Sequence, residues 1–299
     1  MRTFILLSIV IAVFVTVLAA FSSNNPKLKI NKTIQKSIDN FRFNHIAVIV
    51  MENKTFDEIA GNKEAPYINS LIEKYGLAAK YSAVTHPSLP NYLALLGGDT
   101  FDVTGDCENC FIPDENLVDR LEQRGLTWKA YMESMPSPCY IGSSGLYAQK
   151  HDPFIYFDDI RNNPKRCSKI VDYSQLLNDL KSRQTAPDFI WITPNLCNDM
   201  HDCPVSTGDK WLSEQIPSIL NSEAFSKSDS LIVLTFDEGN DNDNNVATIL
   251  IGKNVKPGYR SQVAYTHYSL LKTIEQNWGL DYLTTNVEKS PAMFEFFKK

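Results

Sequence analysis

Two apolar runs of strand length constrain the fold of this chain more than any other feature. They are HIAVIVM at 45–51 and SLIVLTFDE at 230–238, and neither shows the strict alternation of apolar and polar residues that a half-exposed strand has. A strand that is apolar on both faces belongs inside a parallel sheet covered by helices. The 299 residues are enough to bury such a sheet.

Segments with helical spacing separate further strand-like segments. Helices are predicted at 65–76, 116–125, 207–222 and 266–279, and further strands at 127–134, 187–194 and 246–253. Pro217 is expected to kink the third helix or to restart it. The alternation predicts an α/β fold, with a mostly parallel sheet sandwiched between helices.

The N-terminal residues differ from the rest of the chain. Phe4 to Phe21 are mostly apolar, follow a single arginine and precede small and polar residues, as is typical of an export signal. We expect a cleaved signal peptide at 1–22, with an uncleaved membrane anchor as the alternative. A polar linker at 23–43 and a single domain at 44–299 follow. The protein is expected to be secreted or anchored outside the cell, touching a membrane only through its N-terminal segment.

The six cysteines agree with export to an oxidising compartment. Short loops favour the pairs Cys107–Cys110 and Cys197–Cys203, which leaves Cys139 to pair with Cys167. A zinc site built on CENC at 107–110 is disfavoured, because no second CxxC motif supplies the remaining ligands.

Polar side chains gather where three of the predicted strands end. They are Glu52 and Asn53 after 45–51, Asn195, Asp199 and His201 after 187–194, and Asp237 and Glu238 at the end of 230–238. The carboxyl ends of parallel strands form one rim, where ligands bind. Crowded carboxylates repel one another unless a cation lies among them. We therefore predict a divalent metal site there, with Ca, Mg, Mn and Zn all left open.

The segment THPSLPNYLALLGGDT at 85–100 places Ser88 directly ahead of an apolar helix. The N–H groups and the dipole at a helix N-terminus favour a bound anion. Taken alone, a serine in this position is more often an N-cap than a nucleophile.

Three motifs in this order resemble those of a known enzyme family. VIVMENKTFD at 48–57 resembles the opening motif of the phosphoesterase family that contains bacterial acid phosphatases and non-hemolytic phospholipases C. SLPN at 88–91 resembles the nucleophile turn of nucleotide pyrophosphatase/phosphodiesterases, and FDEG at 236–239 stands where that superfamily has an Asp-His-Gly metal motif. The combination resembles the alkaline phosphatase superfamily from about residue 45 to 279, and it implies an alkaline-phosphatase-like fold.

The resemblance also implies roles for individual residues. Ser88 would be the nucleophile and form a phosphoserine. The implied metal ligands are Glu52, Asn53, Asp199, Asp237 and Glu238, the implied substrate-binding residues are Asn91 and Asn195, and the implied phosphate-binding or proton-donating histidines are His86, His201 and His267. The segment at 194–202 departs from the Asp-x-x-x-His spacing of the phosphodiesterases. Nothing in the sequence assigns a role to His45 or His151.

We predict from these features an exported, metal-dependent phosphomonoesterase, similar to acid phosphatases and acting on a small phosphoester. A phospholipase C or phosphodiesterase is the alternative, with a phospholipid or inositol phosphate head group as substrate. Aromatic residues of a lid-like insertion around 101–165 would then line the lid. These are Phe111, Tyr131, Tyr140, Tyr147, Phe154, Tyr156 and Phe157.

Other functions are disfavoured. A sulfatase needs an arginine at the fifth position of its modification motif, where this chain has Tyr92. A non-catalytic cell-surface binding protein of the same fold would have lost part of the constellation, and here hydroxyl, carboxylates and histidines are all present. The net charge of −6 and the lack of a basic stripe argue against nucleic acid as a partner.

Overall fold

The predicted sheet forms the centre of the structure, a computed structural model that describes residues 42–240 and 242–298. The strand order is β5-β4-β6-β1-β7-β8-β2-β9, parallel from β5 to β7 and antiparallel on both sides of β8. The strands are β1 His45–Met51, β2 Gly76–Ala78, β4 Trp128–Met132, β5 Ile170–Asp172, β6 Phe189–Thr193, β7 Ser230–Phe236, β8 Thr248–Ile251 and β9 Arg260–Ser261. Two short strands, β3 Tyr81–Ser82 and β10 Tyr265–Thr266, pair in a second sheet.

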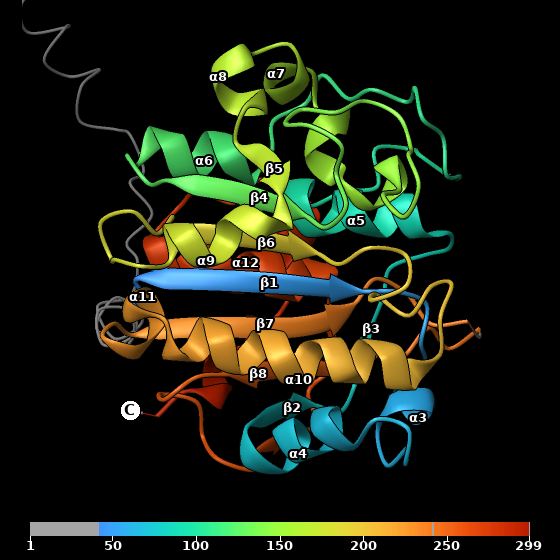
Figure 1. Cartoon of the computed structure of the whole chain (residues 1–299), viewed down its shortest axis with the longest axis vertical. Coiled ribbons are helices and arrows are strands. Elements are labelled where there is room, and N and C mark those ends of the chain that lie inside the picture. Colours follow the sequence, from blue (N-terminus) through green and yellow to red (C-terminus); the bar gives the residue numbers. More distant parts are fainter. Residues whose placement is uncertain (1–41, 241, 299) are drawn as a thin grey trace, which may run out of the picture. The chain divides into compact units, whose positions relative to one another are not determined.

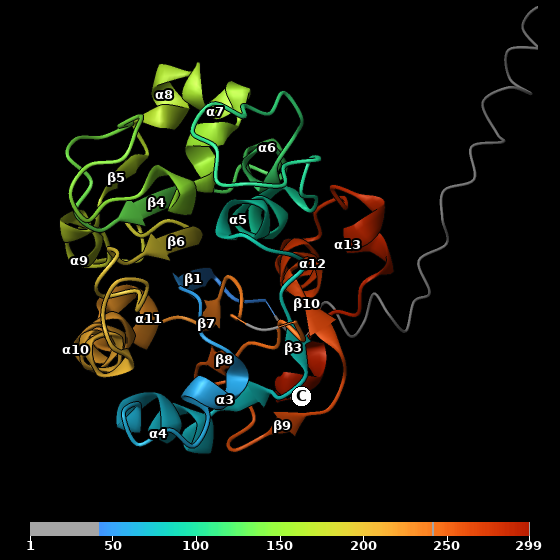
Figure 2. The same ribbon diagram turned by 90° about the vertical axis from the view of Figure 1, so that its right-hand side faces the viewer.

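Helices cover both faces of the main sheet (Figures 1 and 2). Figure 2 shows α4, α10 and α11 on one side and α5, α12 and α13 on the other. The α-helices are α3 Phe56–Ile59, α4 Pro66–Lys74, α5 Ser88–Gly97, α6 Leu117–Gln123, α7 Asp158–Arg161, α8 Pro164–Cys167, α9 Leu176–Asp179, α10 Val205–Asn221, α11 Glu223–Ser226, α12 His267–Trp278 and α13 Thr285–Lys289. Short 3₁₀ helices are η1 Gln149–His151, η2 Pro153–Tyr156, η3 Tyr173–Gln175 and η4 Phe294–Phe296. The predicted α/β class and the predicted layering are confirmed.

The central strands explain why the polar strand ends meet. All residues of β1 and β7 are buried, as their apolar runs predicted. The two strands pair in parallel from His45 opposite Ser230 to Met51 opposite Phe236, and β6 pairs with the other side of β1. Because the three strands run in the same direction and end level with one another, the residues that follow them emerge at one edge of the sheet.

Helix α10 differs from the prediction at Pro217. The helix runs from Val205 to Asn221 with Pro217 inside it, so of the two predicted outcomes the restart is wrong, while a kink stays a prediction. A proline removes only one backbone hydrogen bond from a helix. Here the buried residues Ile216 and Ile219 on either side of Pro217 hold both parts of the helix against the core.

The segment 101–165 contributes to the core. Five of the seven aromatic residues predicted to line a lid are buried, namely Tyr131, Tyr147, Phe154, Tyr156 and Phe157, and they cannot do so. Only Phe111 is exposed, at 38%, and Tyr140 is half-buried. That the insertion acts as a lid stays a prediction, but its aromatic residues mostly stabilise the fold.

The three predicted disulfides are present. Cys107 pairs with Cys110, Cys139 with Cys167 and Cys197 with Cys203. The last pair closes the loop that carries Asp199 and His201, so that loop is held at the edge of the sheet.

The predicted signal or anchor at 1–22 and most of the predicted linker at 23–43 lie outside the described residues. Within residues 42–240 and 242–298, no helix has the length and the apolar character to cross a bilayer.

Buried Glu275 in α12 makes the stability of the fold depend on pH. Burial raises the pKa of Glu275 to about 8, and its Oε2 atom has no hydrogen-bond partner in the described part of the chain. Between an ordinary glutamate pKa near 4.5 and a pKa of about 8, the folded chain keeps a proton that the unfolded chain releases. The contribution of Glu275 to the free energy of unfolding therefore falls as the pH rises through this range.

Glu275→Gln is expected to remove this part of the pH dependence. The variant should be more stable than wild type by about 1–3 kcal/mol at pH 8, and equally stable at pH 4. Urea unfolding at a series of pH values measures the difference. Two curves that stay parallel from pH 4 to 8 would contradict the prediction.

Candidate active site

The polar residues that follow β1 and β7 contact one another directly. The backbone N–H of Asn53 donates to Asp237 Oδ1 at 3.1 Å, and the N–H of Asp237 donates to the carbonyl of Met51 at 3.0 Å. Asn53 has a φ of 42°, in the left-handed region that asparagine tolerates better than most residues. This turn directs the chain back toward β7 immediately after Glu52.

The loop after β6 completes the edge. The backbone N–H of Glu52 donates to the carbonyl of Asp199 at 2.9 Å, which fixes the loop closed by Cys197–Cys203 against the end of β1. Glu52, Asp199 and Asp237 have no exposed surface. Three strand ends therefore bring buried carboxylates into one cluster, as predicted.

Ser88 is the first residue of α5 and faces this cluster. It makes no side-chain cap bond, so the N-cap interpretation is wrong for its hydroxyl. Ser88 Oγ instead donates to Glu52 Oε2 at 3.1 Å and to Glu238 Oε1 at 3.2 Å. A hydroxyl beside two carboxylates at a helix N-terminus has proton acceptors and anion-binding N–H groups within reach.

Burial and mutual repulsion raise the pKa values of these acids. Burial raises the pKa of Asp237 to about 8, with the charge of Glu238 adding to the effect. Burial also raises the pKa of Asp199 to about 7. For Glu52, burial followed by the charges of Asp237 and Asp199 raises the pKa well above its usual range. Without a cation, the cluster would therefore hold protons near neutral pH.

Two details of the cluster fit a bound cation. Asp199 Oδ2 and Asp237 Oδ2 are buried without a hydrogen-bond partner among the described residues. The carboxamide oxygen of Asn53 faces carboxylate oxygens. If the amide were turned so that its nitrogen and oxygen exchanged positions, the nitrogen would donate to Glu52 Oε2 at 3.1 Å and to Asp237 Oδ1 at 3.2 Å. A cation among these oxygens would satisfy all of them. The donor set thus fits a divalent metal.

His151 belongs to the same cluster and was missed in the sequence. Its Nε2 lies 3.3 Å from Glu52 Oε2 and its Nδ1 lies 3.4 Å from Asp199 Oδ2. Burial, with the nearby charge of Lys150 adding to it, lowers the pKa of His151 well below its usual range, so the ring is neutral and able to ligate a metal. Glu52, His151 and His201 offer ligand atoms that all lie within 4.8 Å of one another.

His86 and His201 lie at the more open side of the cluster. The His86 side chain is 47% exposed, and its Nδ1 contacts Glu238 Oε2. His201 Nδ1 lies 2.7 Å from Asp202 Oδ1, and this side chain is 27% exposed. Both rings are therefore close to the acids and in contact with solvent, as an exchange of protons with a substrate requires.

Three of the predicted residues make hydrogen bonds within the protein that bear on their predicted roles. Asn91 accepts from the N–H groups of Val84 and Thr85 and donates to the carbonyls of Thr85 and Pro87, so its amide is fully used in holding the turn before α5. Asn195 likewise accepts from the N–H groups of Cys197 and Asn198 and donates to Ser134. The Asn91 amide is not available to a phosphoryl oxygen without losing these bonds, whereas Asn195 uses only one of its two N–H donors among the described residues.

His267 is the third of these residues. It is fully buried, its Nε2 donates to the carbonyl of Asp237 at 2.6 Å, and its Nδ1 accepts from Tyr81 at 3.1 Å. Burial lowers the pKa of His267 to about 4. The neutral ring supports the backbone of Asp237 and has no proton to give to a leaving group.

Tyr92 replaces the arginine of the sulfatase motif and holds Glu52. It is buried one turn after Ser88, and its hydroxyl donates to Glu52 Oε1. Its ring stacks on His151, with the centroids 5.3 Å apart. Tyr92, the residue that argued against a sulfatase, thus helps to position the side chains of Glu52 and His151.

Comparison with known proteins finds similar sequences over most of the chain. The sequence profile of the Phosphoesterase family matches residues 62–281. The chain is 32% identical over 268 residues to a probable acid phosphatase of Kluyveromyces lactis, covering 84% of this chain and 62% of that protein. It is 35% identical over 243 residues to a phosphatidylinositol-3-phosphatase of Mycobacterium tuberculosis, covering 80% of this chain and 78% of that protein.

A solved structure supports the fold independently. A protein of the alkaline phosphatase superfamily from Vibrio parahaemolyticus superposes with a TM-score of 0.56 at 11% identity, covering 83% of this chain and 69% of that one. At this identity the likeness concerns the fold alone, and it confirms the predicted alkaline-phosphatase-like architecture.

Proposed function

Because the chain belongs to the Phosphoesterase family, we propose that it is a phosphoric ester hydrolase, and specifically a metal-dependent phosphomonoesterase with Ser88 as its nucleophile. One observation carries this proposal. The Ser88 hydroxyl lies at the start of a buried helix, within 3.2 Å of carboxylates that come from two different strand ends. The two relatives named as phosphatases support the same reaction class.

The residues of the site suggest how the reaction proceeds. Ser88 Oγ attacks phosphorus while its proton passes to Glu238 or Glu52, which already accept its hydrogen bond. The bond between phosphorus and the leaving oxygen breaks, and His86 supplies the proton for that oxygen. The N–H groups of Ser88 and Leu89 at the start of α5 bind the phosphoryl oxygens, with substrate replacing Asp106 as the acceptor for Leu89. Water then hydrolyses the phosphoserine and regenerates the Ser88 hydroxyl.

The oxygen donors that would hold a divalent metal are Glu52, Asn53, Asp199, Asp237 and Glu238. Glu52, His151 and His201 form a second group with the donors for a metal. When bound, it would lower the pKa of the serine hydroxyl and offset the negative charge of the phosphoryl group. Among Ca, Mg, Mn and Zn, the two imidazoles of the second group favour Zn.

Export is part of the proposal. The three disulfides support an oxidising compartment, and the apolar N-terminal residues support a signal or an anchor.

Phosphomonoesters are expected to be better substrates than phosphodiesters. A monoester offers three non-bridging oxygens and more negative charge to the cation, the helix N-terminus and nearby side chains, whereas the aromatic residues expected to hold a second substituent are mostly buried. We expect kcat/KM for nitrophenyl phosphate to exceed that for bis-nitrophenyl phosphate by about 100-fold or more, which corresponds to about 3 kcal/mol.

Parallel kinetics on these two substrates, on phosphatidylcholine and on phosphatidylinositol 3-phosphate test the choice. Release of phosphate from the inositol lipid would extend the activity to the substrate in the name of the mycobacterial relative, which is itself a monoester. A higher kcat/KM on bis-nitrophenyl phosphate or phosphatidylcholine would favour a phosphodiesterase or phospholipase C instead.

A further inference from the structure

Lys150 brings an ammonium group close to the nucleophile from the insertion at 101–165. Its Nζ donates to Asp106 Oδ2 at 2.9 Å and lies 3.4 Å from His201 Nε2. The side chain is 24% exposed. An ammonium group has three N–H donors and no acceptor. In the part of the chain that the structure describes, two of these donors have partners, which leaves one for a further acceptor.

The position of Lys150 relative to Ser88 is fixed from two sides. On one side, His201 and Glu52 offer ligand atoms within 4.8 Å of each other, and Glu52 Oε2 is 3.1 Å from Ser88 Oγ. On the other side, Asp106 Oδ1 accepts from the N–H of Leu89 at 3.0 Å, and Leu89 follows Ser88 in α5. Two side chains, His201 and Glu52, therefore separate Lys150 from the nucleophile on the first route, and Asp106 and the Leu89 N–H separate them on the second.

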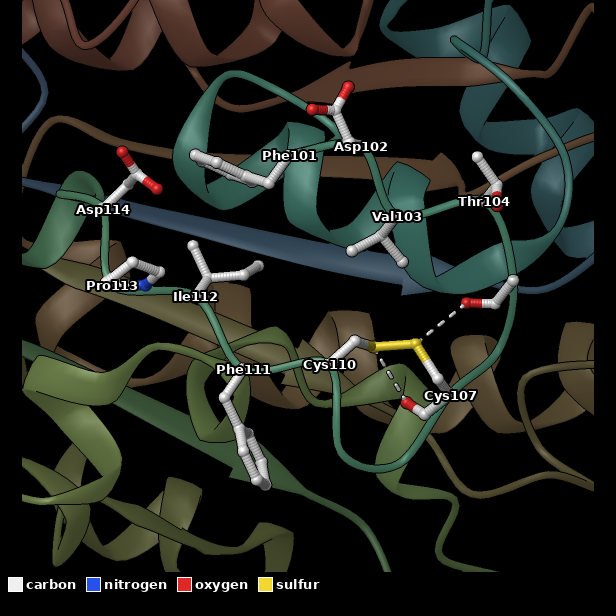
Figure 3. Close-up of a pocket in the computed structure, with 11 residues that line it drawn as sticks. Phe101, Asp102, Val103, Thr104, Cys107, Cys110, Phe111, Ile112, Pro113 and Asp114 are labelled. Atoms are coloured by element: carbon white, nitrogen blue, oxygen red, sulfur yellow. Dashed lines mark hydrogen bonds between the residues drawn. A yellow bond between two sulfur atoms is a disulfide. The ribbon is translucent and has the colours of Figure 1, made fainter.

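Asp106 occupies the partners that an anionic substrate would use. Its two carboxylate oxygens accept from the helix N–H next to the nucleophile and from the Lys150 ammonium. These are the donors that bind phosphoryl oxygens at helix N-termini and in phosphate sites. Asp106 precedes the Cys107–Cys110 disulfide, which pins its loop (Figure 3).

The surface hollow of about 530 Å³ in Figure 3 is a different place. Residues of 101–114 line it, and its charged lining residues are Asp102 and Asp114, which would repel a phosphate. The groups that could bind an anion are instead the two donors to the Asp106 carboxylate, the Leu89 N–H and the Lys150 ammonium.

Charge explains why a further cation is needed beside Ser88. Glu52, Asp199, Asp237 and Glu238 are all acidic, and a phosphomonoester carries a charge of nearly −2 at pH 7. The ammonium group of Lys150 lies at the edge of this cluster, in contact with Asp106 and His201, where it can offset part of this negative charge.

We propose that Lys150 binds the phosphoryl group of the substrate and favours dianionic monoesters over monoanionic diesters. Before substrate binds, the Asp106 carboxylate accepts the hydrogen bond of the Lys150 ammonium. The proposal rests on the proposed function. It assigns to the insertion a direct part in substrate recognition, which the sequence suggested only through aromatic residues.

The test compares Lys150→Met, Lys150→Arg and Asp106→Asn in the metal-loaded protein. Calorimetry measures binding of inorganic phosphate and of dimethyl phosphate at pH 7, and kcat/KM is measured on nitrophenyl phosphate. Lys150→Met should weaken phosphate binding and lower kcat/KM by about 10- to 100-fold, but should change dimethyl phosphate binding by less than about 3-fold. Lys150→Arg should keep most of the phosphate affinity.

Two controls separate substrate binding from a structural salt bridge. Asp106→Asn breaks the same ion pair but leaves the ammonium, so phosphate affinity should stay the same or rise. Lys129 on β4 makes a comparable half-buried ion pair with Asp179, with Nζ and Oδ2 2.7 Å apart. Lys129→Met removes this pair and should leave the phosphate affinity, the dimethyl phosphate affinity and kcat/KM unchanged.

Several results would overturn the proposal. One is a loss of phosphate affinity in Asp106→Asn that matches Lys150→Met, and another is an equal loss for phosphate and dimethyl phosphate. Wild-type protein that binds phosphate without turnover would contradict the proposed function, while the comparison of phosphate affinities would still decide the role of Lys150. Wild-type protein that neither binds phosphate nor hydrolyses the monoester would overturn both the proposed function and the proposed role of Lys150.

Discussion

Ser88→Ala is expected to lower kcat/KM on nitrophenyl phosphate by at least about 10³-fold, or about 4 kcal/mol of transition-state stabilisation. The loss follows because no other hydroxyl in the described site lies between Glu52 and Glu238 at the start of α5. The fold should survive, since the change removes one atom that makes no cap bond. Thermal unfolding and elemental analysis should therefore give values close to those of wild type.

A matched variant and a trapping experiment make this test specific. Ser230→Ala removes a buried hydroxyl at the opposite end of β7 and should leave turnover unchanged. Rapid acid quench with a radioactive monoester should label the peptide that contains Ser88 in wild type but not in the alanine variant. Turnover at the wild-type rate in Ser88→Ala would mean that a water molecule attacks phosphorus directly.

The sequence predicted those parts of the fold that depend on short segments, namely the buried strands, the residues that directly follow them and the disulfides. The runs that became β1 and β7 are apolar on both faces, so their burial and parallel pairing follow from composition. The positions of Glu52 and Asp237 follow in turn, because both residues come directly after strands that pair in register. The disulfides followed from loop lengths and from the cysteine count.

The parts that were missed depend on contacts between distant segments. His151 lies in a short 3₁₀ helix of an irregular insertion, and nothing in its neighbourhood indicates that it meets Glu52 across the fold. Asn91 and His267 were assigned to substrate by motif position, yet their hydrogen bonds hold backbone groups around the site. A motif thus marked which residues gather, but not which of them face the substrate.

Asp237→Asn is expected to weaken metal binding by about 100-fold or more and to lower activity with it. The variant keeps the size of the side chain and an oxygen for the N–H of Asn53, but it removes a negative charge from the cluster. The same change should stabilise the metal-free protein, because burial and Glu238 hold the pKa of Asp237 at about 8 and its Oδ2 has no partner in the described residues. Metal affinity and metal-free stability should therefore move in opposite directions.

Asp209→Asn is the matched control for this prediction. Asp209 is also a buried carboxylate, but it accepts from the N–H groups of Tyr67 and Ile68 at the start of α4. Burial raises the pKa of Asp209 too, but asparagine keeps only one of the two acceptor oxygens. The lost hydrogen bond should lower stability and leave metal content unchanged. Elemental analysis and calorimetric metal titration, together with thermal unfolding in chelator, measure both quantities. Full metal occupancy in Asp237→Asn would remove this residue from the ligand set and leave the group of Glu52, His151 and His201 as the metal site.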